Sequence, residues 1–133
     1  MATADQRNHS KNFLNKAEEY LASAEDNLAA KRFNPAAGDA VHAGISAKDS
    51  IVTVLTGSTS KGKDHAAAAK ELRQGLGQRP EAVKAEKALR ELLSAKGDVE
   101  SGVALVTGAK AESLVRRARS LVDLGVQIVR LGR

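Results

Sequence analysis

The sequence predicts an all-α protein, an antiparallel bundle of four to five helices, and three observations support this. The chain has 133 residues, of which 42% are hydrophobic but only 2% aromatic, so alanine, leucine and valine must build the core, and this favours helices. Two prolines are too few for a loop-rich β protein. Most apolar residues recur at spacings of three and four, the period of an amphipathic helix. We expect a single helical domain over residues 1–133, with an ordered bundle over about 10–131.

The first helix is predicted over about residues 10–31, where one apolar stripe runs along the segment. Ser10 is a suitable N-cap for it. The residues of this stripe are Phe13, Leu14, Ala17, Leu21, Ala24 and Leu28.

The second helix is predicted over about residues 35–56. Asn34 can cap it, and Pro35 suits a first helical turn. Its last part, Ile51–Leu55, has the composition of a strand, but no turn signal separates it from the helical pattern upstream. We therefore expect the helix to continue to a C-terminal cap at Gly57.

The stretch GSTSKGKD, residues 57–64, matches seven of the eight positions of a phosphate-binding loop. The eighth position, which should hold magnesium through a serine or threonine, is Asp64. No strand or parallel sheet is predicted to house such a loop. We interpret Gly57 as the end of one helix and Asp64 as the N-cap of a short helix, with Lys61 and Lys63 in solvent between them.

Two further helices are predicted after a break at Gly77 and Pro80. The first covers about residues 80–95, and Gly97 marks a loop or helix break after it. The second covers about 108–131. The residues expected on the buried faces of these two helices are Val83, Leu89, Leu92, Leu93, Leu114, Val115, Ala118, Leu121, Val122, Ile128 and Val129.

The net charge of +5 is unevenly distributed along the chain. Residues 1–60 carry 6 basic and 7 acidic side chains, whereas residues 61–96 carry 9 and 5, and residues 109–133 carry 6 and 2. The second half is therefore a candidate surface for nucleic acid or an acidic partner, with a solvated helical face as the alternative. Arg116, Arg119 and Arg130 form its candidate basic surface, opposite the apolar stripe of the last helix.

A polar face on the second helix is the other candidate site. His42, Ser46, Asp49 and Thr53 follow each other at helical spacings. The candidate polar cluster consists of His42, Asp49, His65 and Lys96, which a compact bundle could bring together for proton transfer or binding. A structural pair between His42 and Asp49 is the alternative interpretation. We expect no metal site, because two histidines and one aspartate on separate helices do not define one.

The order of the segments resembles the HEPN superfamily (higher eukaryotes and prokaryotes nucleotide-binding domains), in particular its small bacterial members. The resemblance covers about residues 10–131. Its segments are AAGDAVHAGISAKDSIVTVLTG, SKGKDHAAAAKEL, ALRELLSAKGDVESG and AKAESLVRRARSLVDLGVQIV.

The resemblance implies a helical bundle, usually a homodimer, in a bacterial toxin–antitoxin or defence setting. Many members are metal-independent ribonucleases with an Arg-x(4–6)-His motif near the start of a late helix. This chain has no histidine after His65, and Lys96 and Glu100 stand in the matching region. The resemblance therefore implies the fold but not the ribonuclease activity.

We expect a non-catalytic module that binds RNA, a nucleotide or a protein partner, without a cofactor. Three alternatives remain: an unconventional ribonuclease, a helix-turn-helix DNA reader over residues 64–96, and an interaction protein with no nucleic-acid ligand. The chain has no cysteine, and it has neither a signal-peptide pattern nor an apolar run of about 18 residues. These features predict a soluble, cytoplasmic protein that does not enter the membrane.

Overall fold

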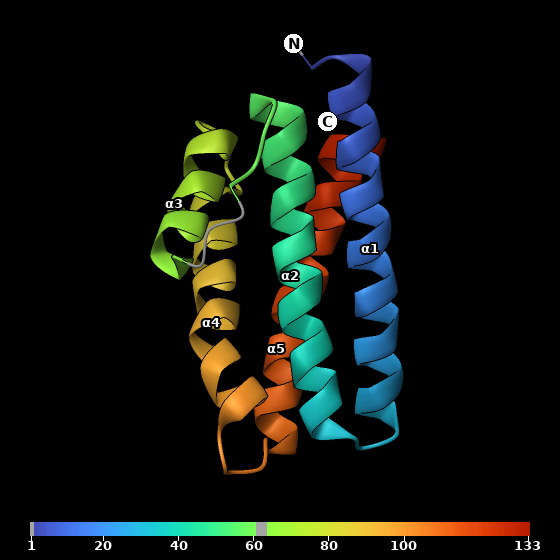
Figure 1. The fold of residues 1–133 in the computed structure, drawn as a ribbon, viewed down its shortest axis with the longest axis vertical. Helices are drawn as coiled ribbons and strands as arrows, with labels where there is room; N and C mark the ends of the chain where they lie inside the picture. Colours follow the sequence, from blue (N-terminus) through green and yellow to red (C-terminus); the bar gives the residue numbers. More distant parts are fainter. Residues whose placement is uncertain (1, 61–63) are drawn as a thin grey trace.

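A computed structural model describes residues 2–60 and 64–133 of the chain. Over these residues the protein consists of helices and their connections, without a strand, which confirms the predicted all-α bundle. The long helices α1, α2, α4 and α5 alternate in direction, and the short helix α3 lies on the flank of the bundle beside α4 (Figure 1). The helices are α1 (Ala4–Ala29), α2 (Phe33–Thr56), α3 (His65–Leu76), α4 (Ala82–Ser101) and α5 (Gly108–Gly125), which continues into the π-helical turn η1 (Val126–Arg130).

Helix α2 lies at the centre of the fold, because it packs against α1, α3, α4 and α5 (Figure 1). Its small residues permit close approach of the neighbouring helices. A Cβ atom added at Gly44 would lie 2.5 Å from Cδ1 of Leu92, a fully buried side chain on α4. The core is aliphatic, as the composition predicts.

Helix α1 begins earlier than the sequence indicated, and the prediction of Ser10 as its N-cap is wrong. Thr3 is the N-cap, and it forms a reciprocal capping box with Gln6. Ser10 is instead fully buried against α2, where its hydroxyl donates to the backbone oxygen of Ser50 at 2.7 Å. The Ser50 hydroxyl donates to the backbone oxygen of Ser10 at 2.9 Å. The polar residues before Ser10 extend the helix because the capping box satisfies its first amides.

The sequence predicted the C-terminal end of α2 correctly but not the residue that caps its N-terminal end. Phe33 is the first helical residue and Arg32 is the N-cap, so the prediction of Asn34 as the cap is wrong. The Asn34 side chain instead accepts a hydrogen bond from the backbone amide of Val106 at 3.0 Å. At the other end, Gly57 adopts a left-handed conformation with φ 98°, which confirms the predicted C-terminal cap. The strand-like stretch before it is helical.

The beginning of α3 was predicted correctly, because the Asp64 carboxylate accepts a hydrogen bond from the backbone amide of Ala67 at 3.1 Å. The predicted solvent positions of Lys61 and Lys63 lie outside the described residues. Helix α3 ends at Leu76, and Gly77 follows it with φ 59°.

Helix α4 corrects two predictions. It continues through Gly97 and ends at Ser101, so Gly97 does not break it and Gly102 follows its end. Val83 was expected on the buried face but is 61% exposed. Ala82 and Ala85 are buried in its place, because the apolar face of this helix is set by its alanines as well as its leucines.

Candidate functional site

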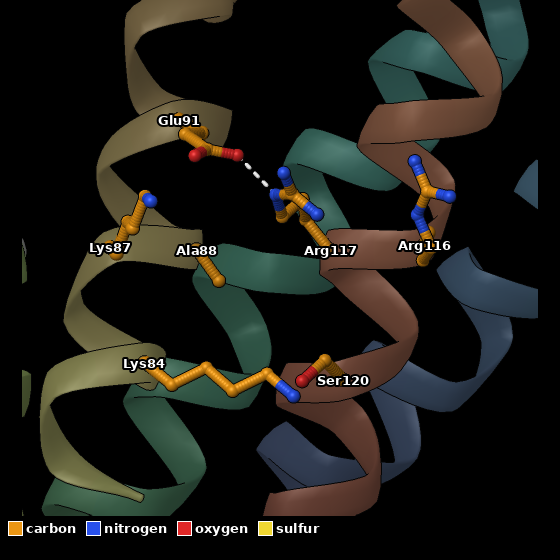
Figure 2. A pocket seen from close by; sticks show the side chains of 7 residues that line it. All are labelled: Lys84, Lys87, Ala88, Glu91, Arg116, Arg117 and Ser120. Carbon is orange, nitrogen blue, oxygen red and sulfur yellow. Dashed lines mark hydrogen bonds and ion pairs between the residues drawn. The ribbon is translucent and has the colours of Figure 1, made fainter.

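A shallow groove with a volume of about 270 Å³ lies between α4 and α5 (Figure 2). Helix α4 contributes Lys84, Lys87, Ala88 and Glu91 to it, and α5 contributes Arg116, Arg117 and Ser120. We call this hollow the α4–α5 groove. Four of its seven lining residues are cationic and one is anionic, so its net charge is positive.

Helical periodicity explains why these side chains meet. Lys84, Lys87 and Glu91 follow each other at spacings of three and four, which place them on one face of α4. Between them Ala88 is only 4% exposed, and its small side chain leaves space between the two helices. Figure 2 shows the Lys84 side chain extending from α4 across the groove toward Ser120 on α5.

The cations of the groove differ in their electrostatic partners. Arg117 forms an ion pair with Glu91 on the opposite wall (Figure 2). Lys84, Lys87 and Arg116 form no ion pair with any carboxylate in the described part of the chain. Three cations therefore face the groove or its rim without local neutralisation.

The glutamates of α4 do not neutralise these lysines. Glu86 accepts from Arg90 at 3.0 Å and from Arg73 at 2.9 Å, and these hydrogen bonds lower the pKa of its carboxyl group. Glu81 lies at the other end of the groove, beside Gln127, and its oxygen Oε1 has no hydrogen-bond partner among the described residues. Glu81 and Glu86 therefore form no ion pair with Lys84 or Lys87 in the described part of the chain.

Ion pairs with α1 engage two of the three arginines of the candidate basic surface. Arg119 donates to Glu25 at 2.9 and 2.5 Å. Arg130 donates to both carboxylate oxygens of Glu18, at 2.9 and 2.6 Å, whereas both hydrogen bonds of Arg119 go to one oxygen of Glu25. The hydrogen bond and charge of Arg130 lower the pKa of Glu18, and Glu18 in turn raises the pKa of Arg130. Of the three predicted arginines, Arg116 is the one that contributes an unneutralised charge to the groove.

The candidate polar cluster is divided between two places. His42 stacks near the Tyr20 ring, with ring centroids 5.2 Å apart, and its Nε2 lies 3.7 Å from Glu100. Lys96 also contacts Glu100, at 3.4 Å. Glu100 thus brings His42 and Lys96 together on the surface between α2 and α4.

Asp49 belongs to a second network, around a buried lysine. Lys48 is only 2% exposed, and its Nζ atom lies 2.5 Å from Glu71 and 3.3 Å from Asp49. Thr59 accepts from Lys48 and donates to Asp49, both at 2.7 Å. The network joins α2 to the following loop and to α3. The side chain of His65, the fourth predicted member, lies outside the described part of the structure.

Sequence reasoning missed Lys48 and Glu71. One signal was present, because Lys48 follows Ala47 and precedes Ile51 and Val52 within the apolar pattern of α2. A lysine at such a position needs a buried partner, since an isolated buried charge is costly. The partner Glu71 lies 23 positions further along the chain, on a different helix, and no local pattern identifies it.

A second hollow, of about 450 Å³, lies between the start of α1 and the end of α2. His9 and Lys16 line it from α1, and Thr53, Gly57 and Thr59 line it from α2 and the loop. The Thr53 hydroxyl is buried and has no hydrogen-bond partner in the described structure. The described residues contain no group of three or more histidine, aspartate or glutamate side chains placed to hold a metal ion.

None of the described helices has the length and apolar character that crossing a membrane requires. Comparison of the chain with models of known protein families, with curated proteins and with solved structures finds no significant match. The α4–α5 groove and its unneutralised cations therefore provide the main basis for a functional proposal.

Proposed function

We propose that this protein is a non-catalytic RNA-binding module that contacts the phosphate backbone through the α4–α5 groove. One observation carries the proposal: Lys84, Lys87 and Arg116 line the groove without a carboxylate partner in the described structure. Solvent-facing cations attract the phosphates of RNA, and counterions held by those phosphates are released on binding. This release supplies most of the free energy of sequence-independent binding. The scarcity of aromatic rings, 2% of the chain, favours phosphate contact over base stacking.

The absence of turnover is part of the proposal. His42 and Asp49 contact different partners, Glu100 and the Lys48 network respectively. No histidine is among the described residues that line the α4–α5 groove. The one carboxylate that lines the groove, Glu91, is paired with Arg117, and this pairing favours phosphate binding over proton transfer.

The resemblance to the HEPN superfamily supports the proposal, because an all-α bundle is the fold it implies. Membership of that superfamily, a homodimer, and a partner protein from a toxin–antitoxin or defence system are further parts of the proposal. Light scattering of the purified protein checks the dimer, with a mass near twice 14.0 kDa expected.

Titration of the protein against labelled single-stranded RNA at several salt concentrations tests the binding. Three phosphate contacts predict a slope of about −2 in a plot of log K against log salt, or a roughly 20-fold loss of affinity between about 50 and 200 mM. Each sample is then run on a denaturing gel, where intact RNA is expected. Cleaved RNA would contradict a non-catalytic module, and absence of binding at low salt would overturn the RNA proposal.

Charge-matched variants locate the site. Lys84→Gln combined with Lys87→Gln should weaken binding and reduce the salt slope by about 1.4. The control, Lys11→Gln combined with Lys70→Gln, removes the same charge from exposed positions outside the groove. Equal losses in both double variants would show that net charge, rather than the groove, is responsible.

A second matched pair uses the arginines of α5. Arg116→Gln should weaken RNA binding more than Arg119→Gln does, because Arg119 is engaged by Glu25. Both residues are exposed on the same helix, so the comparison holds charge and helix context constant. The opposite order would place the RNA on the face toward α1.

A further inference from the structure

We propose that the α4–α5 groove prefers guanine bases, which Glu81 reads at the end of the groove beyond Lys84. This inference rests on the proposed RNA binding and adds base selectivity to it. Another hollow between α4 and α5, of about 190 Å³, adjoins the groove, and Lys84 and Ser120 line both. The added hollow contains the carboxylates Glu81 and Asp123 together with Gln127, and Lys84 is the one cation that lines it in the described structure, so the two ends of the groove differ in chemistry.

The Glu81 carboxylate has unused hydrogen-bonding capacity. Its Oε2 atom accepts from Gln127 at 3.5 Å, the limit of a hydrogen bond, and its buried Oε1 atom has no partner in the described structure. A buried acceptor without a donor is costly, so a ligand that supplies donors gains from satisfying it. Glu81 lines this hollow, and the broad terminal torsion of a glutamate lets its carboxylate rotate to meet a ligand there.

The Glu81 side chain also does not cap its helix. Glu81 is the N-cap residue of α4, yet its side chain makes no capping hydrogen bond. Its carboxylate therefore lies at the start of the helix without stabilising the first turn in the usual way.

Guanine is the base whose donors match this group. Its Watson–Crick edge presents N1–H and N2–H side by side, and a carboxylate can accept both. Adenine and cytosine offer one amino group each on that edge beside an acceptor nitrogen that would face the carboxylate. Single-stranded RNA leaves these edges available for such contacts.

The spacing of the groove suits one nucleotide. Glu81 and Lys87 are separated by about 9 Å along α4, from the helical rise per residue. A base bound at Glu81 thus leaves its own or the adjacent phosphate near Lys84 and Lys87. The cations supply affinity and the carboxylate supplies selectivity, the usual division between phosphate and base contacts.

The test compares labelled uridine 12-mers that carry one central guanosine, inosine or adenosine, which do not pair with themselves, at one salt concentration. The guanosine oligomer should bind about tenfold more tightly than the adenosine oligomer. Inosine, which lacks the N2 amino group, should fall between them. Equal affinities with a normal salt dependence would overturn the guanine preference while leaving the proposed RNA binding intact.

The variant Glu81→Gln should abolish the preference for guanosine and leave binding of the adenosine oligomer equal or stronger, because a negative charge is removed near phosphates. The control, Glu86→Gln, makes the same change on α4 away from both hollows and should retain the preference. A preference that persists in Glu81→Gln would overturn the inference.

If no RNA oligomer binds, the proposed function fails, and mononucleotides still decide the inference. Titration with GMP and AMP, followed by the backbone amide NMR signals of residues 81–91 and 116–127, should then show shifts with GMP that AMP does not produce and that Glu81→Gln abolishes. Identical or absent shifts would overturn guanine recognition by Glu81.

Discussion

Glu91 and Arg117 form an ion pair across the α4–α5 groove, between half-buried side chains on opposite walls (Figure 2). The pair holds one of the four groove cations in place and withdraws it from contact with a ligand. In the proposed RNA complex a phosphate would compete with Glu91 for the same guanidinium group, so we expect this glutamate to limit RNA affinity.

Glu91→Gln should therefore strengthen RNA binding. The change releases Arg117 and removes a negative charge beside Lys87, so the salt slope should steepen by about 0.7, the value for one further phosphate contact. Fluorescence titration at several salt concentrations measures both quantities. Glu19→Gln, at an exposed position of α1 without an ion pair in the described structure, changes the net charge equally outside the groove, and a similar gain in that control would show that Arg117 has no special part.

Lys48→Met should destabilise the protein by about 1.5–3 kcal/mol, because the hydrogen bonds of a buried cation are lost while its carboxylate partners stay. The Glu71 and Asp49 side chains are 30% and 14% exposed, so water compensates them only in part. Urea unfolding measures the change, and amide hydrogen exchange in α3 should accelerate. Lys70→Met, at an exposed position of the same helix α3, serves as control. A variant as stable as the wild type would show that this network does not hold α3.

Acid should loosen the ion pairs that connect the helices. Burial raises the pKa of Glu71, but hydrogen bonds from Lys48 and Ser60 outweigh it, and the resulting pKa lies below the ordinary value of 4.5. Glu18 and Glu86 also have lowered pKa values, through Arg130 and through Arg90 and Arg73 respectively.

A carboxyl group whose pKa is lower in the folded state stabilises the fold fully above its unfolded value. This contribution is lost as the pH falls through the folded-state pKa. Thermal unfolding between pH 7 and 3 should therefore show a falling melting temperature below about pH 4.5. Glu71→Gln should reduce this dependence, whereas Glu19→Gln, at an exposed position of α1, should not. A melting temperature that is constant down to pH 3 would contradict the role of these pairs.

Gly97→Ala should stabilise the protein by about 0.5–1 kcal/mol. Gly97 lies inside α4, and an added Cβ atom would meet nothing within 4 Å. Alanine is the better helix former because it loses less backbone entropy on folding. Gly44→Ala is the matched comparison, since its Cβ atom would lie 2.5 Å from buried Leu92 and should cost about 1–3 kcal/mol. Chemical unfolding measures both, and a destabilised Gly97→Ala variant would mean that the α4 C-terminus is not helical in solution.

The sequence by itself determined the helical class and several helix ends. Gly57 and Asp64 were predicted correctly because a left-handed cap and a carboxylate N-cap depend on residues within one turn of each other. Ser10 was assigned wrongly as a cap, because its burial against Ser50 depends on a residue 40 positions away. Gly97 was assigned wrongly for a related reason: the rest of α4 keeps a glycine helical against its intrinsic preference.

The tertiary structure alone decided which charges are neutralised. The arginines of the last helix look alike in the sequence, yet Arg119 pairs with Glu25, 94 positions away, while Arg116 faces the groove. Lys48 likewise depends on Glu71 from another helix. Helical spacing fixes which residues share a face, but the partner of a charge depends on which helix packs against that face. For this reason the sequence predicted a basic second half, and only the packed bundle showed where its cations remain available.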